Sequence, residues 1–259
     1  MKANYHTHTA RCGHAEGTDE QYVLAAIGAG YDTLGFSDHI PYPYRSGFTN
    51  PRVRMTVDQL PQYVDSITRL KEKYAGQIRI LTGFECEYFP EYMGWMRDMK
   101  AEMGLDYLIL GNHYELTDES GMYYGQCRTG AQLKRYVDNT IRGMETGLFA
   151  YLAHPDLFMR AYGRFDDDAR AAARDLSAAC KELNLPMEYN VHDRFIAYLT
   201  NRISYPHPEF FDIAAEAGVR IIIGVDAHEP RELSDTTQWD RAMAELDRFG
   251  DLYIGHLDL

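Results

Sequence analysis

Short apolar segments alternate along this chain with longer amphipathic segments, and this alternation restricts the fold more than any other feature of the sequence. Short apolar runs predict buried strands, whereas apolar residues spaced about 3.6 positions apart predict helices. Regular alternation of the two is typical of a parallel sheet covered by helices. Seven predicted strands fit a closed or nearly closed barrel, so we expect an α/β fold of that kind.

The strand-like segments are 3–9, 32–39, 78–88, 106–115, 148–156, 186–193 and 219–228. The helix-like segments are 19–29, 61–76, 91–104, 129–147, 166–184, 207–218 and 237–250. The first helix carries a predicted capping box of Thr18 and Gln21, and Gly28 and Gly30 close it. An open doubly wound sheet is the alternative, but neither a G-x-G-x-x-G motif after the first strand nor a Walker A motif supports it.

Composition restricts the class of protein. At 259 residues the chain fits one α/β barrel, so we expect a single domain over 1–259. The net charge of −13 opposes nonspecific binding to nucleic acid or to anionic membranes. The four cysteines form no C-x-x-C pair, the N-terminus resembles no signal peptide, and no apolar run of about eighteen residues occurs. We therefore expect a cytoplasmic protein with reduced thiols and a small-molecule partner.

Residues of the metal-ligand type gather at the C-terminal ends of the predicted strands. In a parallel barrel these ends form one mouth, where active sites lie. Residues i and i+2 of a strand share a face, so His6 and His8 point together, as do Asp226 and His228. The residues at or just after strand ends are His6, His8, His14, His39, Glu85, His113, His154, Asp226 and His228.

This residue set predicts a metal site. Two imidazoles on one face can chelate a divalent ion. Nine ligands suit two or three ions, and since only Glu85 and Asp226 are anionic, the ligand shell with its ions is net positive and attracts an anion such as phosphate. Imidazole-rich shells favour Zn, Fe or Mn over Mg or Ca.

The ordered motifs HTH, DH, GFE, NH, AHP and DAH resemble the polymerase and histidinol phosphatase (PHP) superfamily. The segments GFECEYFPEY, LDYLILGNHY and GVDAHEP resemble its monofunctional histidinol-phosphate phosphatases. The resemblance covers nearly the whole chain and implies a distorted seven-stranded (β/α) TIM-like barrel with a trinuclear centre at the C-terminal mouth of the strands. It also implies three ligand groups: His6, His8, Glu85 and Asp226; Glu85, His113 and His154; and His14, His39 and His228.

The function expected from this site is hydrolysis of a small phosphate monoester by a metal-bridging hydroxide. The resemblance makes L-histidinol phosphate the expected substrate, with L-histidinol and phosphate as products, in histidine biosynthesis. Glu85, Asp226 and His228 are the expected catalytic residues, and Asp226 or a water on the metals is expected to protonate the departing alkoxide. No G-x-S-x-G motif for a covalent nucleophile is present.

Substrate contacts are predicted in the loops behind the fifth and sixth strands. Guanidinium groups suit phosphate, which makes Arg160 and Arg194 candidates, and His192 faces the same mouth. Asp193 or Glu115 is a candidate for the amine of histidinol phosphate.

Several local questions stay open in the sequence. Glu87 lies on the same strand face as Glu85, so alternation alone does not select the bridging carboxylate; the resemblance selects Glu85. Cys12 is either a zinc ligand or a free loop thiol. His207 is expected in a loop and His256 on the surface.

Other functions also fit the motifs. A PHP-type phosphodiesterase or exonuclease is one alternative, although the acidic chain argues against it. The others are a phosphatase for another small phosphorylated metabolite, a metal-storing or regulatory protein, and an amidohydrolase-like enzyme. The last class usually uses a bridging lysine, and no predicted strand end carries one.

Overall fold

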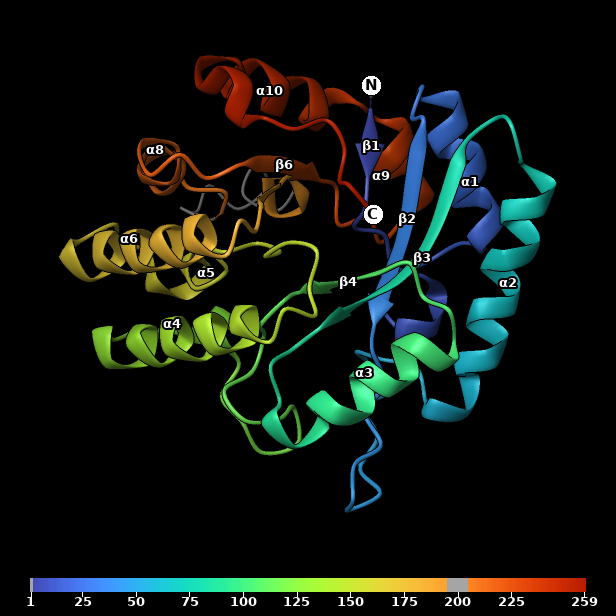
Figure 1. Cartoon of the computed structure of the whole chain (residues 1–259), viewed down its shortest axis with the longest axis horizontal. Coiled ribbons are helices and arrows are strands. Elements are labelled where there is room, and N and C mark those ends of the chain that lie inside the picture. Colours follow the sequence, from blue (N-terminus) through green and yellow to red (C-terminus); the bar gives the residue numbers. More distant parts are fainter. Residues whose placement is uncertain (1, 195–204) are drawn as a thin grey trace.

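The computed structural model describes residues 2–194 and 205–259. It is an α/β fold in which a parallel sheet curls inside a surrounding layer of helices (Figure 1). One sheet has the strand order β1-β2-β3-β4, and β5 pairs with β6 in a second sheet. All pairs are parallel. The strands are β1 (Ala3–Asn4), β2 (Thr33–His39), β3 (Arg79–Cys86), β4 (Tyr107–Leu110), β5 (Met187–Asn190) and β6 (Ile221–Gly224).

The helices cover the outside of these strands, with α1 and α2 on one side and α4, α6 and α8 on the other (Figure 1). Each of the seven predicted helices is present, and the predicted capping box closes the start of α1, where Thr18 and Gln21 exchange hydrogen bonds. Within the described residues, the short helices α5 and α9 and the helical residues 192–194 were not predicted. The helices are α1 (Asp19–Gly28), α2 (Leu60–Lys73), α3 (Met93–Glu102), α4 (Gly130–Glu145), α5 (Met159–Tyr162), α6 (Asp167–Glu182), α8 (Pro208–Glu216), α9 (Pro230–Ser234) and α10 (Thr237–Leu246).

Helix packing follows the apolar spacing of the sequence. The helices pack in chain order, α4 on α6 and α6 on α8, while α1 packs against α2 and α9. In α4 the buried residues recur every three or four positions, as an amphipathic helix requires. Their apolar faces and the outer faces of the strands form the large core.

The strands are shorter than predicted, and in the segment 148–156 strand pairing is reduced to isolated bridges. In this segment only Leu152 makes strand-type bridges, to Leu110 and to Met187, so six strands are assigned in the described residues rather than seven. The physical reason lies in the backbone at the strand ends. His154 (φ 25°) and Asp226 (φ 53°) leave the extended conformation, which ends regular pairing where the side chains turn toward the site.

A second, smaller core fills the space inside the curled sheet. Tyr107 crosses it, and its hydroxyl donates to the carbonyl oxygens of Tyr5 (2.6 Å) and Phe36 (3.1 Å). Tyr5 directly precedes His6, and Tyr151 lies three positions before His154, so the cluster forms a floor under the predicted site. Its buried members are Ala3, Tyr5, Leu81, Tyr107, Ile109, Tyr151, Ala153, Ile222 and Leu257.

Two further features bear on the sequence predictions. All four cysteines are buried and free. Across residues 2–194 and 205–259, none of the helices combines the length and the apolar character that crossing a bilayer would require.

Candidate metal centre

Strand register brings the predicted ligands together. In the β2–β3 pair His39 stands beside Glu85, and both are buried at the C-terminal ends of their strands. Glu85 then lies over the neighbouring segment at Gly111, where a Cβ atom would come within 1.9 Å of the Glu85 Oε1 atom. The glycine of the GNH motif is therefore required because the carboxylate occupies the space of a side chain.

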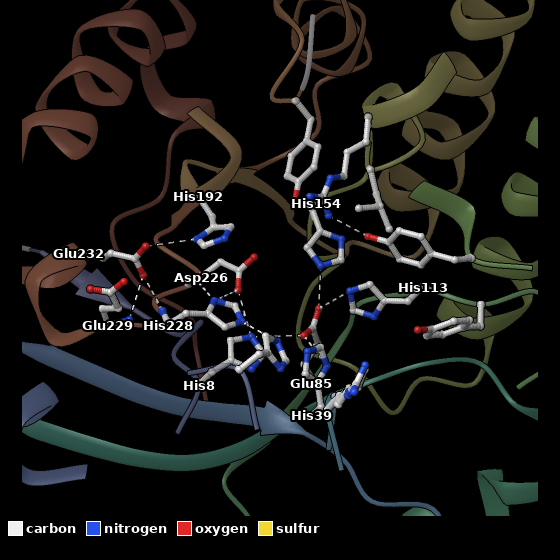
Figure 2. Close-up of a pocket in the computed structure, with 18 of the residues that line it drawn as sticks. His8, His39, Glu85, His113, His154, His192, Asp226, His228, Glu229 and Glu232 are labelled. Carbon is white, nitrogen blue, oxygen red and sulfur yellow. Dashed lines mark hydrogen bonds and ion pairs between the residues drawn. The ribbon is translucent and has the colours of Figure 1, made fainter. Parts of the chain in front are cut away.

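Glu85 is the carboxylate around which the imidazoles gather (Figure 2). Its Oε2 atom lies 3.1 Å from His39 Nδ1, 3.4 Å from His6 Nε2 and 3.5 Å from His8 Nε2. Its Oε1 atom lies 2.6 Å from His154 Nε2 and 3.4 Å from His113 Nε2. The two oxygens thus face two different sets of histidines, as a carboxylate that bridges two ions must.

Asp226 completes the arrangement on the other side of His6 and His8. Its Oδ1 atom lies 3.0 Å from His8 Nε2 and 3.3 Å from His6 Nε2. His228 stacks on His8 with 4.1 Å between ring centroids, and its Nε2 atom lies 3.1 Å from His14 Nε2. All nine predicted residues therefore lie in one cluster.

The charges of the cluster follow from burial and from the mixing of carboxylates with imidazoles. Burial alone would raise the pKa of Glu85 and Asp226, but the surrounding imidazoles, His113 and His6 foremost, hold both well below the usual range. Both carboxylates are therefore ionised. Burial lowers the pKa of His39 and His228 well below the usual value, whereas in His6, His8 and His154 the neighbouring carboxylates outweigh burial and raise the pKa. Metal binding requires the neutral imidazole at each position.

Buried ligand atoms that lack a hydrogen-bond partner test whether this cluster suits a metal ion. Buried polar atoms are nearly always hydrogen-bonded. Within the described residues, however, buried atoms of five of the nine residues have no hydrogen-bond partner, and all are of the type that coordinates Zn²⁺. These atoms are His6 Nε2, His8 Nδ1 and Nε2, His39 Nδ1, His154 Nδ1 and Asp226 Oδ1. Three compact triads that could each hold an ion are His6, His8 and Asp226; His6, Glu85 and His154; and His8, His39 and His228.

Buried carboxylates outside the nine orient the imidazoles. Glu87 accepts from His113 Nδ1 (3.0 Å) and from both terminal nitrogens of the buried Arg54 (3.0 and 3.2 Å). Glu87 is therefore paired with a guanidinium group, whereas Glu85 faces imidazoles only. This difference distinguishes the two carboxylates, which the alternation of side chains along the strand could not do. Asp38 lies 3.5 Å from His8 Nδ1 and accepts the backbone N–H of His39.

One further buried carboxylate, Glu188 of β5, was missed by sequence reasoning. It accepts a hydrogen bond from His6 Nδ1 at 2.8 Å. The only signal for it in the sequence is an acidic residue inside the apolar run PMEYN, where an ionisable side chain needs a buried partner.

A cavity of about 490 Å³ opens above the cluster. Arg160 and His192 line it, as predicted for substrate contacts. Arg160 Nη1 donates to the hydroxyl of Tyr123 (3.0 Å), and its Nε atom lies 3.6 Å from the buried Asp193. Glu232, which sequence reasoning did not select, lies on the same side as His192 (Figure 2). Glu16 and Glu229 also line this side, and the aromatic lining residues are Tyr114, Tyr123 and Tyr205.

The structure places Arg194, a predicted substrate contact, away from the cavity. Its guanidinium group does not line this cavity but pairs with Glu245 of α10 (Nη1 to Oε1, 3.0 Å) and donates to the Tyr189 hydroxyl (2.6 Å). The reason is local, because residues 192–194 are helical and turn successive side chains in different directions. Similarly, Glu115 pairs with Arg135 and is absent from the cavity lining.

The remaining candidates lie at the margin of the site or away from it. Cys12 is buried, with its sulfur 4.0 Å from His14 Nε2. It also forms a compact group with His8 and Asp38. His207 precedes α8 and stacks on Phe165, and His256 pairs with Asp32, so neither reaches the cavity.

Known proteins share this fold and sequence pattern. A probable histidinol-phosphatase of Deinococcus radiodurans is 29% identical over 239 residues, which cover 88% of this chain and 86% of that protein. A histidinol phosphate phosphatase of Lactococcus lactis, solved with zinc, L-histidinol and phosphate, superposes with a TM-score of 0.77 at 16% identity over 100% of this chain and 99% of its own. The structure of a putative histidinol phosphatase from Listeria monocytogenes gives a TM-score of 0.74 at 22% identity over 90% of this chain and 98% of its own.

The sequence model of the PHP domain matches residues 4–192, which is well over half of the chain. This span holds seven of the nine clustered residues, and Asp226 and His228 follow it on the β6 side. The chain belongs to the PHP domain family.

Proposed function

We propose that this protein is a metal-dependent phosphatase that hydrolyses L-histidinol phosphate to L-histidinol and phosphate. One observation carries the proposal: eight of the nine clustered metal-ligand residues line a cavity whose wall also carries Arg160, and the ninth, His6, is buried against them. The relative from Deinococcus radiodurans is named a probable histidinol-phosphatase, and the Lactococcus lactis structure holds zinc, L-histidinol and phosphate. The names of these two relatives indicate the substrate, and the residues that line the cavity give a chemical reason for it.

We infer that the strands close into a distorted seven-stranded barrel within a single domain over 1–259. The support is the hydrogen bonding of the segment around Leu152. Ala153 N donates to Leu110 O (2.9 Å), and Leu152 N donates to Pro186 O (3.0 Å), so this segment connects β4 to β5. On the other side, Thr7 bridges Ala227 in parallel, which joins β1 to the segment after β6.

The nine residues fit two or three ions of Zn, Fe or Mn. We assign one ion to His6, His8, Glu85 and Asp226, a second to Glu85, His113 and His154, and a third to His14, His39 and His228. The buried, unpartnered imidazole nitrogens and the ionised carboxylates support this assignment. When bound, such ions make water acidic enough to attack at neutral pH and offset the charge of the phosphoryl group.

The protein's own groups have distinct roles in this proposal. Glu85 holds two sets of imidazoles at fixed separation, and Asp226 and His228 lie beside His8 at the cavity floor. Because the surrounding imidazoles hold the pKa of Asp226 well below its usual range, Asp226 stays ionised and is a poor proton donor to the departing alkoxide. Supplying the proton for the departing alkoxide then falls to water at the site rather than to Asp226.

The cavity is polar in a way that suits the substrate. Arg160 and the imidazole cluster favour the phosphate end. Glu229 and Glu232 lie on the side of His192 (Figure 2), and Glu16 also lines the cavity, so a cationic amine would be attracted there. A diester of nucleic acid would carry no such amine, so this acidic side favours histidinol phosphate over the phosphodiesterase alternative.

A substrate panel tests the proposed function. The metal-reconstituted protein is assayed with L-histidinol phosphate, with several monoesters that lack an amine, and with a dye diester. We expect kcat/KM for L-histidinol phosphate to exceed that for every other substrate by at least about tenfold, which is about 1.4 kcal/mol of transition-state preference. Turnover of the diester alone, or none of L-histidinol phosphate, would contradict the proposal.

The role of Arg160 gives a separate prediction. Arg160→Ala should lower kcat/KM for L-histidinol phosphate about 10- to 150-fold, because a charge-assisted hydrogen bond contributes about 1.5–3 kcal/mol. Arg160→Lys should restore only part of this loss, since lysine lacks the planar fork. Steady-state kinetics and metal analysis are the measurements, and metal content should stay unchanged.

Arg194→Ala is the matched control for Arg160→Ala. Both changes remove an arginine from a short helical segment, Arg160 from α5 and Arg194 from residues 192–194, but the guanidinium of Arg194 is held by Glu245 outside the cavity. We expect near wild-type kcat/KM for Arg194→Ala. Equal losses of kcat/KM in the two variants would show that the position of Arg160 in the cavity does not explain its effect on catalysis.

A further inference from the structure

Glu188 is a fully buried carboxylate on β5, inside the curled sheet. Space for it exists only because residue 224 of the neighbouring strand is a glycine: a Cβ atom at Gly224 would come within 1.8 Å of the Glu188 Oε1 atom. A buried carboxylate is unfavourable unless several donors satisfy it. The donors that surround Glu188 therefore indicate its role.

Two of the proposed metal ligands donate directly to Glu188. Its Oε1 atom accepts from His6 Nδ1 at 2.8 Å, and its Oε2 atom accepts from the backbone N–H of His154 at 3.0 Å. With Nδ1 committed to Glu188, the Nε2 atom of His6 is left to face Glu85 Oε2 (3.4 Å) and Asp226 Oδ1 (3.3 Å). The second contact holds the backbone where His154 adopts a φ of 25°, a conformation that a side-chain-bearing residue rarely adopts.

A third ligand is connected through Asn190, two residues further along the same strand. The Asn190 side-chain amide donates to Glu188 Oε2 (2.9 Å) and to Asp226 Oδ2 (3.2 Å). Asp226 also has a positive φ, of 53°. Glu188 is thus connected to ligands that come from three separate segments, after β1, after residue 152 and after β6.

We propose that Glu188 is a positioning residue that sets the geometry of the two ligand groups containing Glu85, and not of the group formed by His14, His39 and His228. In the part of the chain that the structure describes, no hydrogen bond joins Glu188 to those three histidines. The inference rests on the proposed metal centre but not on the proposed substrate. Zinc binding tests it without any substrate, so its failure and that of the proposed function are distinguishable.

Glu188→Gln is the decisive variant. The amide keeps the size of the side chain, but it offers one acceptor oxygen and an NH₂ group that is itself a donor. Either His6 Nδ1 or the groups on the other oxygen then lose their acceptor. Changing such an outer carboxylate typically weakens metal binding about 10- to 100-fold. We expect a loss of this size for the ions of the two Glu85 groups, measured by zinc competition against a chelator.

The pattern among the ions distinguishes positioning from general damage. Anomalous scattering from zinc-soaked crystals of Glu188→Gln should show reduced occupancy between His6, Glu85 and His154, and full occupancy beside His14, His39 and His228. Equal loss from all three groups, or wild-type affinity throughout, would overturn the proposal.

Tyr151→Phe is the matched control. The Tyr151 hydroxyl also donates to Glu188 (3.2 Å) and is buried, but Tyr151 contacts none of the nine ligands through that hydroxyl. Zinc affinity of Tyr151→Phe should stay within about threefold of wild type, and a loss equal to that of Glu188→Gln would overturn the proposal. If circular dichroism shows that Glu188→Gln does not fold, zinc binding by Asn190→Ala is measured instead. Weaker zinc binding in the group containing Asp226 supports the inference, and unchanged binding contradicts it.

Discussion

Removal of divalent metal is expected to abolish hydrolysis of L-histidinol phosphate, with a fall in kcat of at least about 10³-fold, equivalent to about 4 kcal/mol in the activation barrier. The reason is that no nucleophilic serine or cysteine motif is available and the cavity floor consists of imidazoles and two carboxylates. The measurement is steady-state phosphate release after exhaustive dialysis against a chelator.

Re-addition of single metals is the control for that experiment. Zn²⁺, Mn²⁺ or Fe²⁺ should restore activity, whereas Ca²⁺ should not, because imidazole-rich shells suit the former and oxygen shells suit the latter. Activity that survives dialysis, in protein shown to contain no metal, would require a mechanism based on protein groups alone.

Glu85→Gln is expected to have the second large effect. The two oxygens of this carboxylate face the histidines of two proposed ion sites, so the amide removes the negative charge that would offset both ions. Removing one partner of a buried pair costs about 3–5 kcal/mol. We therefore expect metal affinity and kcat/KM to fall roughly 10²- to 10³-fold. Metal content by elemental analysis and steady-state kinetics measure the two quantities.

Glu87→Gln is the control for that variant, because Glu87 lies on the same strand face two residues away. Its carboxylate is held by the guanidinium of Arg54, which retains Asp118 as a second partner (Nε to Oδ2, 2.9 Å). Losing this hydrogen bonding should lower the free energy of unfolding by about 1–3 kcal/mol and leave most of the metal bound. Equal metal content and equal turnover in the two variants would refute the ranking.

Much of this site could be predicted because its ligands share one structural position, at or just after the C-terminal end of a strand. Each predicted strand ends near a histidine or a carboxylate, and parallel strands bring their C-terminal ends to one edge. The cluster of His39, Glu85 and His154 follows from that rule alone. The helices could be predicted equally well, since α4 and α6 carry long amphipathic patterns with capping residues at their starts.

What could not be predicted depends on side-chain direction and on single backbone angles. Arg194 and Arg160 look alike in sequence, and only the local helix turns one toward Glu245 and leaves the other in the cavity. Glu87 and Glu85 share a strand face, and Arg54, distant in sequence, separates them. In the strand expected at 148–156 only Leu152 forms strand-type bridges, although backbone hydrogen bonds to the neighbouring strands run from Ala150 to Ala153. The backbone leaves the extended conformation at His154.

Anomalous diffraction at the zinc absorption edge from crystals of the zinc-loaded protein tests the central claim most directly. We expect two or three peaks at the cavity floor. One should lie among His6, His8 and Asp226, one between Glu85 and His154, and the third beside His14, His39 and His228, each within about 2.0–2.2 Å of imidazole nitrogens or carboxylate oxygens. No anomalous peak at this cluster, or zinc bound only elsewhere on the chain, would contradict it.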